Sequence, residues 1–115
     1  MNWIGTWHNQ YGSSLQITDD AGGKISGTFR TALSDSSFFG YELPIVGVHK
    51  GNCISFAFVG GAHGDAVCSF TGLLRDGHLQ TLWHVVSDVR ASANGEKTRW
   101  PHAAMTNADT FKRVE

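Results

Sequence analysis

The stretch Gly5–Ser14, with the sequence GTWHNQYGSS, decides the fold. Because side chains alternate along a strand, Trp7 and Asn9 point to the same side of one strand. Gly12 permits a turn with positive φ, and Ser13 begins the return strand. The sequence therefore predicts a hairpin in which Asn9 and Ser13 lie close together. A buried amide beside a buried hydroxyl needs a partner, either from the protein or from a ligand.

Short runs of alternating apolar and polar residues recur about every ten to twelve residues, which is typical of an all-β sandwich or barrel. Turns rich in glycine, of which the chain has 14, separate these runs. The expected strands are Ile4–Asn9, Ser13–Thr18, Ile25–Thr31, Leu43–His49, Cys53–Val59, Ala66–Leu74, Leu79–Val86 and Asp109–Val114. Eight sequential strands joined by short hairpins predict an antiparallel up-and-down β-barrel, which closes and so has no free edges. We expect one such domain over residues 1–115.

Two stretches interrupt this regular order. Leu33–Gly40 has the serine and aspartate content of a loop, yet it contains the adjacent pair Phe38 and Phe39. These two rings either fold back onto the core or form a lid over a cavity mouth. About twenty residues, Arg99–His102 among them, separate the last two expected strands. A gap of that length in a compact domain is usually functional or partly helical.

Composition and charge exclude several classes of partner. Lys and Arg total 9 against 10 Asp and Glu, and the net charge is −1, so the chain has neither a nucleic-acid footprint nor a polybasic membrane patch. No apolar run approaches the roughly 18 residues of a membrane-spanning helix. The chain starts almost directly on its first strand and has no signal-peptide pattern. Either a signal has been removed or the protein is not exported.

The cysteines and histidines do not form a recognisable reactive site. Cys53 and Cys68 permit one disulfide, but alternation points Cys68 inward with Phe58 and Phe70, and Cys53 outward. We therefore expect two free thiols, with Cys68 behaving as a small apolar residue. The six histidines form no known metal-binding motif, and no nucleophile–base pair or pair of carboxylates is visible, so neither a metal site nor an enzyme is expected.

His84 is placed differently from the other histidines. It lies on the outward side of the strand expected over Leu79–Val86, beside the inward Trp83, where a subunit contact would fall. Because histidine titrates near neutral pH, we expect association through that face to weaken on acidification.

The chain resembles a known family. Gly5–Ser13 resembles the first-hairpin signature of the avidin/streptavidin family, and Asp109–Val114 is similar to the last strand of that family. Ser26–Phe29 and Gln80–Trp83 match its third and seventh strands. The resemblance spans the whole chain and implies a small non-enzymatic β-barrel that binds biotin at one end and needs no cofactor. It also implies a homodimer or homotetramer that is secreted or periplasmic.

The same resemblance implies roles for individual polar residues. Asn9 and Ser13 would bond the ureido carbonyl oxygen of biotin, Asp109 would accept from a ureido N–H, and Thr31 would lie near the other ureido side. From the residues alone, Asn9, Ser13 and Asp109 are more simply interpreted as a structural polar cluster where the first, second and last strands meet.

The apolar part of the expected site comes from the strands and one loop. Phe29, Phe58, Phe70 and Trp83 would form its wall and Trp7 its floor, or all would simply fill the barrel. The Leu33–Phe39 loop would cover the valerate end, with Ser34, Ser36 or Ser37 donating to the carboxylate. Trp100 would reach a neighbouring subunit, with a one-residue gap in the alignment. The residues expected to contact the ligand are Asn9, Tyr11, Ser13, Phe29, Thr31, Leu33, Ser34, Asp35, Phe58, Cys68, Phe70, Trp83, Val85, Trp100 and Asp109.

Several positions depart from the family pattern. Phe29 stands in place of a tyrosine, Phe58 and Phe70 in place of tryptophans, Cys68 in place of a hydroxyl residue, and Ala66 in place of a serine. Each lost hydrogen bond to a buried ligand costs about 0.5–1.5 kcal/mol, or close to tenfold in affinity. We therefore expect biotin binding weaker than is typical of the family. The alternative is a barrel that has lost biotin binding, that takes another small ligand, or that acts only through its oligomer surface.

Overall fold

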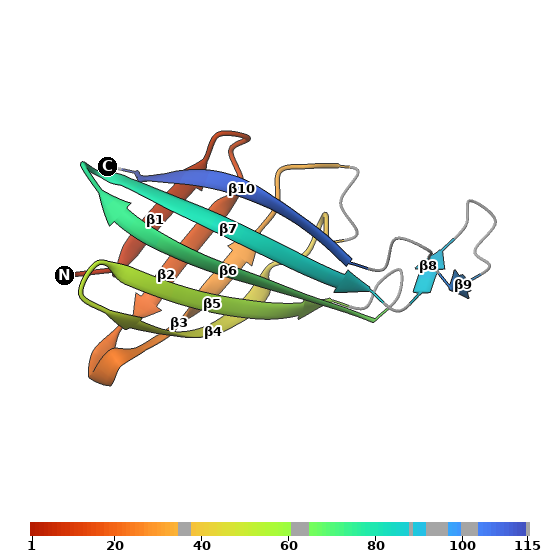
Figure 1. Ribbon diagram of the computed structural model, residues 1–115, viewed down its shortest axis with the longest axis horizontal. Helices are drawn as coiled ribbons and strands as arrows, with labels where there is room; N and C mark the ends of the chain where they lie inside the picture. The colour runs from red at the N-terminus through yellow and green to blue at the C-terminus, as the bar shows by residue number, and fades with distance from the viewer. Residues whose placement is uncertain (35–37, 61–64, 88, 92–96, 100–103, 115) are drawn as a thin grey trace.

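Eight antiparallel strands close into one barrel in the computed structural model, which describes residues 1–34, 38–60, 65–87, 89–91, 97–99 and 104–114 (Figure 1). Around the barrel the strand order is β1-β10-β7-β6-β5-β4-β3-β2. The strands are β1 (Gly5–Asn9), β2 (Ser14–Asp19), β3 (Lys24–Arg30), β4 (Leu43–Lys50), β5 (Cys53–Gly60), β6 (Ala66–Arg75), β7 (His78–Ser87) and β10 (Ala104–Arg113). This architecture confirms the predicted up-and-down barrel.

Neighbouring strands are joined by turns whose glycine and aspartate residues the sequence predicts. Asp76 and Gly77 both have positive φ between β6 and β7, which is the conformation of a two-residue hairpin turn of the Asp-Gly type. Gly12 has φ 85° between β1 and β2. A single 3₁₀ turn, η1 (Ala21–Gly23), connects β2 to β3.

The last strand differs from its expected range. β10 begins at Ala104, five residues before the predicted start at Asp109, and pairs with β7 from Ala104 opposite Val86 to Lys112 opposite His78. Apart from Met105, its first half contains small and polar residues, so the apolar alternation that reveals a strand is weak there. Pairing with the long β7 stabilises it instead.

Part of the long gap before β10 is also strand. β8 (Val89–Ala91) pairs with β9 (Lys97–Arg99) in a separate two-stranded sheet outside the barrel. The expectation of partly helical structure is therefore wrong for these described residues. None of the described residues forms a helix long and apolar enough to span a membrane.

Aromatic side chains close the barrel at the end where the chain begins. Trp3 and Trp7 are fully buried there with ring centroids 5.7 Å apart, and the Trp7 indole N–H donates to the Trp3 carbonyl at 3.1 Å. The Arg113 guanidinium lies 4.6 Å above the Trp7 ring and donates to the Ile4 carbonyl at 2.8 Å. Trp7 thus belongs to the core, and Trp3, which the sequence reading left outside the first strand, packs beside it.

Candidate ligand-binding site

The connections that follow β1, β3, β5 and β7 leave the barrel at the end opposite the chain termini (Figure 1). We call this the open end. The up-and-down order brings the last residues of β1, the start of β2 and the residue after β3 to the same rim.

Four buried polar side chains meet near this rim: Asn9, Ser13, Thr31 and Asp109. The Asn9 amide nitrogen donates to one Asp109 carboxylate oxygen at 3.1 Å, which ties β1 to β10. The Asn9 amide oxygen accepts the backbone N–H groups of Tyr11 at 3.0 Å and Ser13 at 2.9 Å. Asn9 therefore shapes the β1–β2 turn with its oxygen and faces Asp109 with its nitrogen.

Backbone N–H groups also hold the hydroxyl oxygens of Ser13 and Thr31 in place. Ser13 Oγ accepts the Ala32 backbone N–H at 2.9 Å and lies 3.5 Å from Thr31 Oγ1. Thr31 Oγ1 accepts the Leu33 backbone N–H at 3.2 Å. Both hydroxyl oxygens thus have fixed positions. Among the described residues, the second amide hydrogen of Asn9 has no acceptor, so one donor at the rim remains available.

Asp109 accepts on both carboxylate oxygens. Its second oxygen receives the Gln10 amide N–H at 3.3 Å, while Gln10 accepts the Thr110 backbone N–H at 3.0 Å. The buried Thr81 hydroxyl donates to the Asp109 backbone carbonyl at 2.8 Å. The sequence reading did not select Gln10 or Thr81. Sequence features could have indicated both residues. Gln10 belongs to the Gly5–Ser14 stretch, and Thr81 lies on the inward side of β7 with Trp83.

Phenylalanine rings form a continuous wall inside the barrel. Phe29 and Phe58 stack with centroids 4.9 Å apart and planes 13° apart, and Phe70 lies 5.6 Å from Phe29 and 6.1 Å from Phe58. Trp83 is partly buried with its ring 6.5 Å from that of Phe70. The four expected wall residues, Phe29, Phe58, Phe70 and Trp83, are therefore brought together.

The family model for avidins matches residues 1–114. The chain belongs to the avidin family. Among solved structures, bradavidin is 30% identical over 96% of this chain and 79% of its own, with a TM-score of 0.74. The bradavidin2–biotin complex is 20% identical over the full length of both chains, with a TM-score of 0.78, and apo shwanavidin is 23% identical over 100% and 98%, with a TM-score of 0.77. No curated protein sequence is similar enough to this chain to match it.

Both cysteines of this avidin-family barrel are free thiols, as expected, with Cys53 exposed and Cys68 buried. Cys68 lies between Phe58 on β5 and Val85 on β7 in the register of the sheet. Burial, and secondarily the negative charge of Asp109, raise the pKa of the Cys68 thiol from 9.0 to about 12. Cys68 is therefore a neutral thiol that does not act as a nucleophile or as an anion at ordinary pH.

Other expected contact residues of the avidin-like site lie at its rim. Tyr11, Leu33 and Ser34 are exposed, and Val85 is partly buried against the core. Asp35, Ser36, Ser37 and Trp100 lie outside the described residues.

The two adjacent phenylalanines of the β3–β4 connection behave differently from each other. Phe38 is buried, with its ring edge-on to Phe58 at 5.2 Å, whereas Phe39 is exposed. Phe38 leaves no room for a side chain at Gly60 of β5. Of the two alternatives, folding back onto the core is therefore right for Phe38 and wrong for Phe39.

Because β10 begins earlier than predicted, two further residues lie on its inward side that the sequence analysis did not select. Asn107 and Met105 lie opposite Trp83 and Val85 of β7, so they share the inward side of β10 with Asp109. Both are exposed, which puts them near the mouth of the barrel. In the part of the chain that is described, no three His, Cys, Asp or Glu side chains gather as a metal site would require.

Proposed function

We propose that this avidin-family chain binds biotin, without catalysis, at the open end of its barrel. The observation that carries the proposal is the cluster of Asn9, Ser13, Thr31 and Asp109, buried at one end of a barrel whose interior wall is aromatic. Family membership supports it, and so does the similarity to bradavidin2, which has been solved with biotin.

The chemistry of the cluster suits a cyclic urea. The ureido head of biotin has one carbonyl oxygen, which needs donors, and two N–H groups, which need acceptors. The remaining Asn9 amide hydrogen and the Ser13 hydroxyl are suited to donate to the oxygen. The Asp109 carboxylate and Thr31 Oγ1 are suited to accept from the N–H groups. The Phe58, Phe70 and Trp83 rings would then cover the apolar faces of the ligand.

We further propose that the affinity is weaker than is typical of the family. Phe29 has no hydroxyl, and its ring stacks on Phe58 instead of donating to a ligand. The neutral Cys68 thiol is a weak donor in place of a hydroxyl. Two lost hydrogen bonds of about 1 kcal/mol each would reduce affinity by more than tenfold.

A second candidate is a flat apolar ligand other than biotin. The stack of Phe29 and Phe58, with Phe38 and Phe70 against it, presents ring carbon without a polar atom. Such a surface favours an aromatic or heterocyclic ligand over one that needs several hydrogen bonds.

Thermal unfolding with and without biotin tests the first proposal. A thousandfold excess of biotin over Kd should add about 4 kcal/mol to the free energy of unfolding. Asp109→Asn should weaken binding at least tenfold, because it removes a charged acceptor, whereas Asp76→Asn in the β6–β7 turn should bind as wild type. An unchanged midpoint at millimolar biotin, in a folded barrel, would rule out biotin and favour the second candidate.

Two further expectations rest on the family resemblance. We propose that the chain forms a homodimer or homotetramer, with no nucleic acid or membrane as partner. Secretion or a periplasmic location stays a prediction.

A further inference from the structure

Gln10 connects the first and last strands of the barrel through both ends of its side chain. Its amide nitrogen donates to Asp109 Oδ1 at 3.3 Å, and its amide oxygen accepts the backbone N–H of Thr110 at 3.0 Å. The opposite orientation of the amide would place its oxygen against the carboxylate and its NH2 group against an N–H, so only one orientation satisfies both partners. The Gln10 carboxamide is therefore fixed in position and in direction.

The bond to Thr110 continues the pairing of β1 with β10 where the backbone pairing ends. The last backbone pair joins Asn9 to Phe111, after which the chain turns toward β2. Gln10 then accepts the Thr110 N–H with its side chain instead of its backbone, and so supplies the acceptor that a strand N–H needs. This bond belongs to the fold. The pairing of the strands does not require the second bond, from Gln10 to Asp109.

Two successive residues hold the two oxygens of the Asp109 carboxylate. Asn9, at the end of β1, donates to Oδ2 at 3.1 Å, and Gln10 donates to Oδ1 at 3.3 Å. Rotation of the carboxylate about its Cβ–Cγ bond would break at least one of these hydrogen bonds. Each carboxylate oxygen can accept a further hydrogen bond. Asp109 is therefore held in one orientation and can still accept from a ligand.

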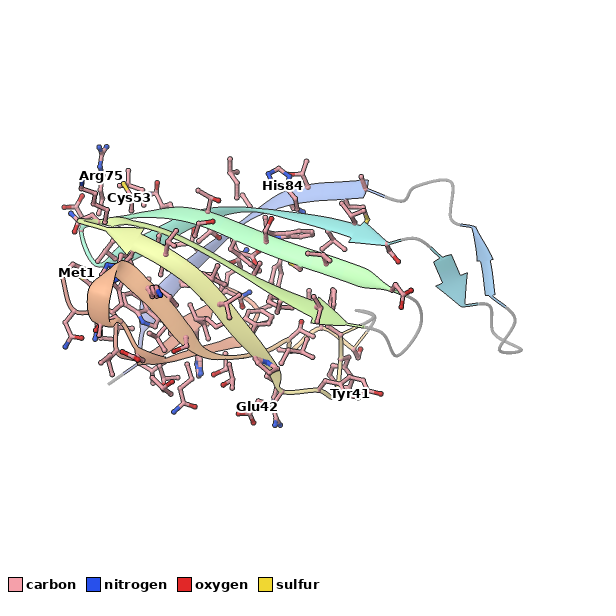
Figure 2. The ribbon with its side chains drawn as sticks, turned by 90° about the horizontal axis from the view of Figure 1, so that it is seen from below. Met1, Tyr41, Glu42, Cys53, Arg75 and His84 are labelled. Carbon is pink, nitrogen blue, oxygen red and sulfur yellow. The ribbon has the colours of Figure 1, made fainter. Side chains whose placement is uncertain are left out.

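Neutral donors, and not a cation, stabilise the charge of Asp109. Among the side chains that the structure describes, no Lys or Arg forms an ion pair with it: Arg30 pairs with Glu42, Arg113 donates to a backbone carbonyl near the start of the chain, and Arg75 lies at the end of the barrel opposite the open end (Figure 2). Asp109 is only 9% exposed, and a buried carboxylate without donors is costly. Gln10 is one of the two side chains that donate to this carboxylate.

Gln10 approaches the carboxylate from the solvent side of the rim. Its side chain is exposed, whereas those of Asn9 and Asp109 are buried. The interior side of the carboxylate is thus left to a ligand inside the barrel.

We propose that Gln10 is a positioning residue of the candidate ligand site: its amide holds the Asp109 carboxylate in the direction from which a ligand N–H approaches. The inference rests on the proposed function, because Asp109 is the group that would meet the ligand. Gln10 itself makes no contact with the ligand. A ligand N–H would meet a carboxylate that is already ordered, which lowers the entropic cost of binding.

A double-mutant cycle separates this role from the structural role of the bond to Thr110. Gln10→Ala should weaken biotin binding about five- to tenfold, because the carboxylate loses one of its two side-chain donors. In the Asp109→Ala background the same substitution should change the affinity by less than about twofold, because no carboxylate remains to be oriented. Isothermal titration with biotin measures all four proteins. Equal losses in the two backgrounds would show that Gln10 acts only through the fold and would overturn the proposal.

Gln10→Glu is the conservative variant, in which the donor is present or absent according to pH. Two carboxyl groups within hydrogen-bond distance retain a shared proton at low pH. The protonated glutamate can donate to Asp109 and accept from Thr110 as the glutamine does, whereas the ionised glutamate repels Asp109. Relative to wild type at the same pH, we expect this variant to bind biotin equally at pH 5 and about tenfold more weakly at pH 8.

Gln16→Glu makes the same change on the exposed side of β2, so this matched control should bind as wild type at both pH values. If the affinity of Gln10→Glu relative to wild type is the same at pH 5 and pH 8, the proposal is wrong. Urea unfolding of each variant verifies that it is folded. A wild type that gives no thermal shift with millimolar biotin would overturn the proposed function instead, so the two failures can be told apart.

Discussion

Asn9 combines a structural role with a proposed binding role. Its amide oxygen fixes the β1–β2 turn through two backbone N–H groups, while its nitrogen holds Asp109 and keeps one further hydrogen. The two readings that the sequence left open, a structural cluster and a ligand site, are therefore compatible. The internal bonds hold Asn9, Ser13 and Asp109 in place before any ligand arrives, which lowers the cost of ordering them on binding.

Phe29→Tyr should tighten biotin binding by about fivefold, because the new hydroxyl supplies one hydrogen bond of about 1 kcal/mol near the ureido group. The measurement is isothermal titration with biotin. Phe39→Tyr, at an exposed position of the β3–β4 connection, serves as the control and should bind as wild type. Equal affinities for Phe29→Tyr and wild type would show that the missing tyrosine hydroxyl does not limit binding.

The buried Cys68 thiol should make the free energy of unfolding depend on pH. Its pKa is raised to about 12 in the folded chain, so the folded state holds a proton that the unfolded state releases above pH 9. The stabilisation is complete below about pH 9 and is lost as the pH rises toward 12, by about 1.4 kcal/mol for each pH unit. Urea unfolding at pH 8 and pH 10 measures it.

Cys68→Ala should remove the decrease in the free energy of unfolding that the Cys68 thiol causes between pH 8 and pH 10. Cys53→Ala, at an exposed thiol, should retain this decrease. Alanine at position 68 also leaves a small cavity, which lowers stability by the same amount at both pH values and so leaves the comparison intact. Identical pH slopes for wild type and Cys68→Ala would contradict the assignment of a buried neutral thiol.

At the scale of the strand, two glycines allow β-strands to approach each other closely. A Cβ atom at Gly27 of β3 would overlap the backbone carbonyl of Gln16 on β2, and one at Gly47 of β4 would overlap that of Ser55 on β5. Gly27 lies opposite Ile17, where the β2–β3 register shifts. These positions set the local curvature of the barrel wall and explain the glycine within the Ser26–Phe29 motif.

Gly27→Ala should therefore lower the free energy of unfolding by about 1–3 kcal/mol, the usual cost of overpacking a closed interior. Ser26→Ala, at the exposed neighbouring position, is the control and should change stability little. Urea unfolding of both variants gives the comparison. A Gly27→Ala barrel as stable as wild type would mean that β2 and β3 can separate there without cost.

For the molecule as a whole, the barrel was predictable because the sequence patterns that indicate it lie within single strands and the turns between them. Each strand up to β7 shows alternation between recognisable turns, and the predicted ranges agree with the structure within about two residues. The start of β10 was missed because Ala104–Ala108 gains its strand conformation from pairing with β7, a contact between distant parts of the chain. Trp3 was missed for a similar reason, since its neighbours His49 and Asp20 come from other strands and turns.

The site was predictable in part. The resemblance indicated Asn9, Ser13, Thr31 and Asp109, and the structure brings them together. It could not indicate that Phe38 would pack on Phe58, because that contact depends on the path of a loop. The roles of all these residues toward biotin stay predictions until binding is measured.

The pairing of β1 with β10 also has a consequence for biosynthesis. Asn9 and Asp109, which join these strands, are 100 positions apart in the sequence. The barrel can therefore close only after β10 has been synthesised, and until then β1 and β7 remain unpaired sheet edges that can recruit other chains. Closure between such distant segments also makes folding slow relative to that of helical domains of similar size. The interval between synthesis of β7 and docking of β10 is accordingly the period in which a nascent chain is most exposed to aggregation, and in which a chaperone that shields strand edges would protect it most.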